Sequence, residues 1–422
     1  MKKITAGDIM HVYGGFGQES DYNVRLVIRL KDEIDGNMLQ EAVASAAGRY
    51  PYLLLKMKRN DNEIYYEENN EPIAVLNTKK RVTLGAEETG YHMWAVCYFE
   101  DKIYLDFYHG LCDGTGMYMV LSTILYYYTK LRYGDVESEG IRTLDDEIEP
   151  EEYIDPQDLL PEIDISNIPT PQLEPAFSLI EDGGLTPCEQ KLYDVVIPEK
   201  DFLKFSSAND ASPGVMVSIL IARTIDKLFP ERNKGIMGSY VINARPMLHA
   251  PKTHHNCVST VFFDYSGKIR KMPFDRQCTV YRGKTFIQSE EERIQKAMTV
   301  GSSRNKAIAK ATPQVEAKMQ TYGMMLSKGR KLFTCMVSYV GKWKYPSVGK
   351  YIKEFWTHVP NANGFLVEIA AVNGKIFMTM HQNFEEDILV RAFEKELTEN
   401  GISFETTEML NDVAHMDLPE KV

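Results

Sequence analysis

Hydrophobic and polar positions recur with two different periods along the chain, and together they predict a mixed α/β protein. Residues 23–30 alternate polar and apolar side chains with the period of two that is typical of a strand. Apolar residues then recur at helical spacing through residue 48, with Asp35 as the expected N-cap and Pro51 beyond the end. Strand and helix patterns continue to alternate in the rest of the chain, which favours an α/β fold.

The same patterns predict the remaining elements and a division into two lobes. Further strands are expected at 63–67, 91–99, 102–108, 191–197, 236–242, 258–265, 334–339, 365–372 and 375–381, and further helices at 116–133, 214–228, 289–328 and 385–400. A chain of 422 residues exceeds what one hydrophobic core usually organises, so two domains are expected. Residues 135–187 are rich in proline and acidic side chains and predict the connection. We therefore place an N-terminal lobe at 1–165, ending in an acidic linker at 135–165, and a C-terminal lobe at 166–422.

The net charge of −12 is concentrated in one segment. Residues 135–164 hold 13 acidic side chains and one arginine, which accounts for the whole imbalance, and an exposed, solvated linker is the simplest interpretation. Residues 327–353 hold seven lysines and arginines and no acidic residue. This basic strip fits either a site for a phosphorylated small molecule or a solvated face. An acidic protein with one basic strip is not typical of nucleic-acid binding.

Apolar runs and cysteines indicate the compartment. The longest apolar stretches are too short to span a bilayer, and the two N-terminal lysines precede no apolar run of a secretory signal. The six cysteines are widely scattered and form no CxxC pair, which fits reduced thiols better than disulfides or a cysteine-bound metal. We expect a cytoplasmic protein without a membrane span or a metal centre.

Two segments that lie 273 residues apart resemble each other. Residues 102–109 and 375–382 are both strand-like, and a polar turn and a helix pattern follow each of them. Their alignment sets His109 opposite Gln382. One explanation is a duplicated α/β unit in which only the first copy kept a reactive loop, and the other is chance similarity. Duplicated units commonly face each other across a cleft in which ligands bind.

The first of these segments runs into the sequence Tyr-His-Gly-Leu-Cys-Asp-Gly at 108–114. His109 follows a strand and precedes a helix, so rigid elements on both sides can hold it. An imidazole with a pKa near 6.5 can accept a proton at neutral pH. Gly114 and Gly116 suit a tight turn with unusual backbone angles, and Asp113 suits a bond to the loop or to an arginine. A structural histidine is the competing interpretation.

This motif resembles the HxxxDG loop of the chloramphenicol acetyltransferase-like superfamily, which includes alcohol acetyltransferases, peptide-synthetase condensation domains and polyketide-associated acyltransferases. Four looser matches follow the order of the family: Asp21-Tyr22-Asn23, the strand 241–246 with Arg245, the strand entry 255–260, and Val337-Ser338-Tyr339-Val340-Gly341. The chain lacks the additional first histidine of many relatives and has Tyr339 where asparagine is usual. The resemblance spans nearly the whole chain, but only the His109 loop is a sharp motif.

The resemblance implies an α/β fold of two chloramphenicol acetyltransferase-like lobes, with pseudo-duplicated mixed sheets and helices enclosing a central tunnel. It also implies acyl transfer from a thioester, on coenzyme A or on the pantetheine of an acyl carrier protein. The acceptor would be a small molecule with a hydroxyl, amine or thiol group. Acyl-CoA is then a co-substrate, and no permanently bound cofactor is expected.

The same resemblance assigns roles to single residues. His109 is the expected general base, and Ser338 is the candidate hydrogen-bond donor to the oxyanion. Asp113 is expected to be structural and to pair with Arg245. The candidates for contacts to substrate or coenzyme A are Tyr339, Lys342 and Lys344.

Two alternatives to a CoA-dependent acyltransferase remain open. A condensation-type enzyme would fail with free acyl-CoA and react with a pantetheinylated carrier protein. A catalytically silent homologue would serve as a binding partner, although the intact His109 loop argues against it. Cys112 as a nucleophile lacks an orienting partner, and three further histidines lack a ligand that completes a metal site: His249, His254 and His255.

Overall fold

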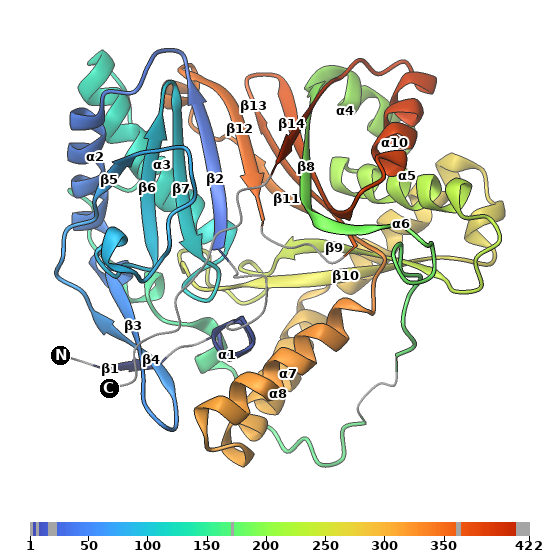
Figure 1. The fold of residues 1–422 in the computed structure, drawn as a ribbon, viewed down its shortest axis with the longest axis horizontal. Coiled ribbons are helices and arrows are strands. Elements are labelled where there is room, and N and C mark those ends of the chain that lie inside the picture. The colour runs from blue at the N-terminus through green and yellow to red at the C-terminus, as the bar shows by residue number, and fades with distance from the viewer. Residues whose placement is uncertain (1–2, 6–7, 16–22, 170–172, 360–363, 411–422) are drawn as a thin grey trace.

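The computed structural model describes residues 3–5, 8–15, 23–169, 173–359 and 364–410, and it places two large sheets side by side (Figure 1). Asp21 and Tyr22 of the looser sequence matches lie outside the described residues. Each large sheet has its own hydrophobic core, so the chain has two lobes, as its length predicts.

The N-terminal lobe is built on a five-stranded sheet. Its strand order is β12-β2-β7-β6-β5, with bounds β2 (Asn23–Leu30), β5 (Val75–Asn77), β6 (Trp94–Phe99), β7 (Lys102–Tyr108) and β12 (Ile352–His358). Helices α2 (Gly36–Arg49) and α3 (Gly114–Tyr133) pack on each other and contribute to its core. Asp35 caps α2 as predicted, since its side chain accepts from the backbone N–H of Asn37 and Met38. A small sheet of β1 (Lys3–Thr5), β4 (Ile64–Glu68) and β3 (Leu55–Arg59) extends this lobe.

The C-terminal lobe is built on a seven-stranded mixed sheet. Its strand order is β10-β9-β11-β13-β14-β8-β15, with bounds β8 (Pro187–Pro198), β9 (Ile236–Asn243), β10 (Val258–Tyr265), β11 (Cys335–Lys342), β13 (Phe365–Val372), β14 (Lys375–Phe384) and β15 (Glu405–Leu410). The second core lies between one face of this sheet and the helices α4 (Glu199–Ala208), α5 (Pro213–Leu228), α6 (Phe274–Gln288) and α10 (Ile388–Glu399). The remaining helices are α1 (Ile9–Gly14), α7 (Glu291–Ala311), α8 (Val315–Arg330) and α9 (Pro346–Gly349).

Strand β12 crosses between the lobes. The chain leaves the seven-stranded sheet after β11, adds β12 to the edge of the five-stranded sheet, and returns as β13. β12 pairs antiparallel with β2, from Ile352 opposite Leu30 to His358 opposite Arg25. The boundary between the lobes at residue 165 stays a prediction. By its pairing with β2, strand β12 belongs to the N-terminal sheet.

The two lobes repeat one arrangement of elements. In the first, β2 is followed by α2, and the hairpin β6–β7 is followed by α3, with the strand order β2-β7-β6. In the second, β8 is followed by α4, and the hairpin β13–β14 is followed by α10, with the order β8-β14-β13. This equivalence favours duplication over chance similarity. In the second copy, Gln382 donates to the carbonyls of Phe384 and Glu386, so it closes its own turn.

Three differences from the expected elements have simple causes. The helical run at 289–328 is two helices, α7 and α8, because Pro313 has no N–H to continue the first one. α6 was not expected, since its sequence has almost no apolar face. β12 was also missed, and its residues carry both charged and aromatic side chains without a clear alternation.

Most acidic side chains of the segment 135–164 are exposed, as the sequence predicts, but Glu152 docks the segment against the N-terminal lobe. Glu152 is buried and accepts a bidentate pair of hydrogen bonds from Arg49 on α2, at 2.9 and 2.8 Å. Tyr52 donates to the same carboxylate at 2.6 Å, and Arg142 lies 3.4 Å from it. Burial would raise the pKa of Glu152, but the hydrogen bonds from Arg49 and Tyr52 lower it to about 2.

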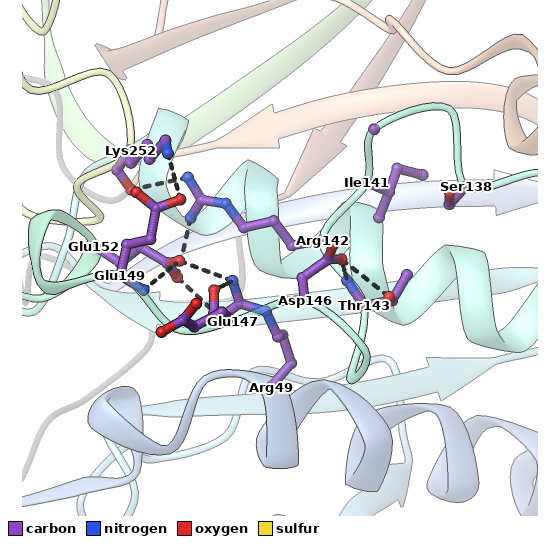
Figure 2. A pocket seen from close by; sticks show the side chains of 11 residues that line it. Arg49, Ser138, Ile141, Arg142, Thr143, Asp146, Glu147, Glu149, Glu152 and Lys252 are labelled. Carbon is purple, nitrogen blue, oxygen red and sulfur yellow. Dashed lines mark hydrogen bonds and ion pairs between the residues drawn. The ribbon is translucent and has the colours of Figure 1, made fainter.

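Arg49, Arg142 and Glu152 line a pocket of about 220 Å³, to which Lys252 of the C-terminal lobe also contributes (Figure 2). Its three basic side chains are all bonded to carboxylates, since Lys252 also pairs with Glu149. The backbone N–H of Lys252 donates to Glu151, and that of His254 donates to the carbonyl of Glu152. The acidic segment therefore fastens the loop at 252–256, which belongs to the C-terminal lobe, onto the N-terminal lobe.

We expect Arg49→Met to lower the free energy of unfolding by about 3 kcal/mol, because it leaves a buried carboxylate without its main partner. Urea unfolding followed by circular dichroism measures the effect. The Arg49→Met/Glu152→Met double variant should lose less than the sum of the two single variants. Additive losses would show that the pair is not coupled.

Candidate active site

The loop at 109–113 connects two rigid elements of the N-terminal lobe. β7 ends at Tyr108, and α3 begins at Gly114 with Asp113 as its N-cap. The Asp113 carboxylate accepts from the backbone N–H of Gly116 at 2.8 Å. The loop is thus fixed at its end by the first turn of α3.

Arg245 of the C-terminal lobe fixes the same carboxylate. Its guanidinium donates to both oxygens of Asp113, at 2.8 and 2.7 Å, so the pair expected from sequence is present. Both side chains are buried, and Cys257 adds a backbone N–H at 3.0 Å. The remaining N–H groups of Arg245 donate to the carbonyls of Thr253 and His255 and to the side-chain oxygen of Asn243. A buried ion pair of this kind is tolerated because each lone pair and proton has a partner.

The requirement for glycine lies at Gly116 and not at Gly114. Gly114 is the first residue of α3, it has no positive φ, and a Cβ there would meet nothing within 4 Å. The expected tight turn with unusual angles at Gly114 is therefore wrong. At Gly116 a Cβ would come within 2.2 Å of the carbonyl oxygen of His254. Only glycine allows the loop of the C-terminal lobe to approach α3 this closely.

His109 stacks on a second histidine that the sequence did not single out. The rings of His109 and His11, from α1, lie 4.8 Å apart between centroids with an interplanar angle of 18°. The Nδ1 atom of His109 has no hydrogen-bond partner in any other described residue. Burial and, to a smaller extent, the charge of His11 lower the pKa of His109 to about 4, against the opposing effects of Asp8 and Asp113. The imidazole is therefore neutral at pH 7, in the form that accepts a proton.

His11 belongs to a small polar cluster with Asp8 and Asn256. Asp8 bonds the Nδ1 of His11 at 2.7 Å and accepts from the side-chain amide of Asn256 at 2.5 Å. Burial would lower the pKa of His11, but the charge and hydrogen bond of Asp8 raise it above the ordinary value. Burial would raise the pKa of Asp8, but His11 and Asn256 lower it to about 2. The Asp8 carboxylate and the more basic ring of His11 thus lie beside the less basic ring of His109.

Helix α1, which carries Asp8 and His11, is held in place by contacts on two sides. Tyr108 donates its hydroxyl to the carbonyl of His11 at 2.9 Å, and α1 packs against α8, where Gly14 meets Leu326. In the sequence, only the i, i+3 spacing of Asp8 and His11 pointed to this cluster, and such spacing is common on helix surfaces. Asn256, from the loop before β10, could not be related to either residue before the fold was known.

Among the described residues, no hydrogen bond, ion pair or ring contact joins the other predicted site residues to His109. Ser338 is on β11, and none of the hydrogen bonds of the described residues joins it to His109. The side chain of Tyr339 packs against the second core, on the opposite face of β11 from Ser338. Lys342 pairs with Glu199 at 2.9 Å, and Lys344 is exposed.

The structure supports neither Cys112 as a nucleophile nor a histidine metal site. Burial raises the pKa of Cys112 well above the usual value, so a thiolate nucleophile is disfavoured. His249 bonds Glu291, His254 bonds the carbonyl of Gly116, and His255 bonds the carbonyl of Tyr153. Among the described residues, no three His, Cys, Asp or Glu side chains converge as metal ligands, and no helix is long and apolar enough to cross a bilayer.

Comparisons with known proteins find likeness in structure only. No family model matches the chain, and no curated protein matches it in sequence. It resembles TRI101 of F. graminearum, solved with coenzyme A and T-2 mycotoxin, with TM-score 0.63 and 10% identity over 96% of this chain and 100% of that one. It also resembles the trichothecene 15-O-acetyltransferase TRI3 of Fusarium sporotrichioides, with TM-score 0.58 and 9% identity over 94% of each chain. The epimerization domain from the third module of tyrocidine synthetase B gives TM-score 0.52 and 11% identity over 94% of this chain and 97% of that one.

These likenesses show the fold. The chain has the two-lobed α/β fold of the chloramphenicol acetyltransferase-like and condensation-domain proteins, as the sequence predicted. Because the identities are near 10%, activity and residue roles require arguments from this chain itself.

We expect Asp113→Ala to lower the free energy of unfolding by about 3–5 kcal/mol, because a buried arginine loses its carboxylate. Asp35→Ala is the matched control, since Asp35 caps α2 in the same way but lies partly exposed; its loss should cost about 1 kcal/mol. Equal losses for the two variants, measured by urea unfolding, would mean that Asp113 acts as a helix cap alone.

Proposed function

We propose that this protein is an acyltransferase that moves an acyl group from a thioester to a small-molecule acceptor, with His109 as the general base. The observation that carries the proposal is the position of His109 on a loop that both lobes hold in place, with its Nδ1 atom unbonded by any other described residue. Burial lowers the pKa of its imidazole to about 4, so the ring is neutral at pH 7. The fold, shared with a structure solved with coenzyme A and with an O-acetyltransferase, supports this reading.

The reaction needs one proton acceptor and one oxyanion donor. His109 takes the proton of the acceptor hydroxyl or amine as that oxygen or nitrogen attacks the thioester carbonyl. The tetrahedral intermediate collapses, the carbon–sulfur bond breaks, and the thiolate takes the proton from His109. The products are an ester or amide and a free thiol, and the imidazole is neutral again.

Ser338 remains the candidate donor to the oxyanion, on the strength of its place in the matched strand. Its hydroxyl lies beside the carboxyl group of Glu368 in the unliganded chain. Asp113 and Arg245 act on the loop geometry and not on the reacting atoms. Lys342 and Lys344 stay candidate contacts for the donor phosphates.

The acyl donor is a pantetheine thioester, and the pantetheine belongs either to coenzyme A or to a carrier protein. The likeness to a domain of a peptide synthetase module keeps the carrier protein as the alternative. Parallel assays with free acyl-CoA and with an acylated carrier protein separate them. A chain that binds neither donor would be the silent homologue.

We expect His109→Ala to reduce acceptor-dependent release of free thiol from acyl-CoA by at least about 100-fold, since general base catalysis contributes this much. The melting temperature reports whether the variant stays folded. His249→Ala is the matched control, because this histidine is exposed and bonds Glu291. Retained activity in His109→Ala would rule out the assigned base.

We expect His11→Phe to move the acidic limb of the kcat/KM profile to higher pH. Phenylalanine keeps a ring against His109 but removes the charge that lowers the pKa of His109, so this pKa rises. Because the reactive form is the neutral imidazole, activity is then lost at a higher pH. The reference variant is His249→Phe. If the acidic limb of the kcat/KM profile is the same in His11→Phe as in this reference, His11 only packs against His109 and does not affect its pKa.

A further inference from the structure

A row of polar side chains crosses the centre of the seven-stranded sheet. Ser338 of β11 is directly opposite Glu368 of β13, which is opposite Thr379 of β14, which is opposite Asp194 of β8. Residues that are paired in this way project from the same face of a sheet. We call these four residues the polar row.

The polar row faces the N-terminal lobe. The sequence neighbours of its members project to the other face, into the second core: Val337, Val367, Ile369, Met378 and Val195. On the side of the row, the Nε2 of His358 on β12 lies 3.6 Å from Asp194. The Trp356 ring, also on β12, meets Phe377 of β14 at 4.8 Å. The row therefore lies where the two sheets approach each other.

The positions on both sides of the row are mainly apolar. One flank consists of Ala370, Phe377 and Val196, and the other of Met336, Leu366 and Leu192, with His381 between the last two. The Nε2 of His381 accepts from the backbone N–H of Val359 at the crossing of the chain. A face that serves only to pack two lobes together would be apolar throughout, so four polar side chains in line require another explanation.

Glu368 is a carboxyl group of the row that no basic side chain of the described residues approaches as an ion pair. Its side chain is 7% exposed, and in the part of the chain that the structure describes it forms no ion pair. Asp194, by contrast, accepts from Thr379 at 2.8 Å and has His358 nearby. Burial raises the pKa of Glu368 to about 8, and the Ser338 hydroxyl opposes this rise. Buried carboxyl groups are normally paired with a cation, whereas the partner of this one among the described residues is the neutral hydroxyl of Ser338.

On the basis of the proposed acyl transfer, we propose that the polar row binds an ammonium group of the acceptor through Glu368. The acceptor is then an amino alcohol or a diamine. A protonated nitrogen has no lone pair with which to attack a thioester, so the atom that is acylated must be a second heteroatom. His109 deprotonates that second heteroatom, while Glu368 holds the cation and orients the molecule between the lobes.

Straight-chain α,ω-amino alcohols of three to eight carbons test this proposal against n-alcohols of the same lengths, with thiol release from acyl-CoA as the readout. At the best length, wild type should show kcat/KM for the amino alcohol at least about tenfold above that for the alcohol, as a charge-assisted hydrogen bond provides. Glu368→Gln should abolish this preference, so that kcat/KM becomes equal for the amino alcohol and the n-alcohol; the ratio is the readout, because Glu368 also bonds the candidate oxyanion donor Ser338. Glu408→Gln, on the exposed edge strand β15, should keep the preference. A preference that survives in Glu368→Gln would overturn the proposal.

Binding without donor separates this proposal from the proposed function. The melting temperature is measured with each amino alcohol alone, for wild type, Glu368→Gln and Glu368→Met, the last being a second variant without a carboxyl group. If no acceptor releases thiol, the proposed function fails. Stabilisation of wild type by amino alcohols, absent in both variants and with n-alcohols, would still support the cation site. Stabilisation that is equal in all three proteins, or absent in wild type, contradicts it.

Discussion

The ion pair of Asp113 and Arg245 is the interaction on which the site depends. The carboxylate caps α3 and ends the His109 loop, while the guanidinium belongs to the other lobe and also gathers the carbonyls of the loop at 253–255. The pair therefore places the lobes relative to each other and fixes the loop by the same contacts. Because both groups are buried, neither can leave without a large cost in stability.

Three further connections reinforce this contact. β12 carries the chain from one sheet to the other, and the acidic segment fastens the loop at 252–256 through Glu151 and Glu152. α1 brings Asp8 and His11 to the same place, where Asn256 from that loop meets them. Asp8, His109 and Asn256 come from regions that are far apart in sequence, and the closed lobes bring them together.

The sequence predicted the regular elements with strong periods and the local chemistry, because these depend on neighbouring residues. The cap by Asp35, the strand before His109 and the helix after it follow from spacing alone. The partner of Asp113 required the resemblance to a family, since nothing local relates it to Arg245. The stacking of His11 and the polar row could not be predicted. The first depends on how a six-residue helix packs, and the second on strand register between segments up to 185 residues apart. Gly116 shows the limit of local rules, because glycine is required there by the close approach of the His254 carbonyl and not by an unusual backbone angle.

The most direct test of the account is the pKa of the His109 ring in the unliganded protein. Histidine labelled with 13C at Cε1 gives a resonance for each ring, and the spectrum of His109→Gln identifies the one that belongs to His109. The account predicts that this resonance remains that of a neutral imidazole down to about pH 5, because burial and the charge of His11 lower the pKa to about 4. A titration midpoint near the ordinary value of about 6.5 would contradict it. The ring would then be solvated, and the loop would not hold a neutral base for acyl transfer.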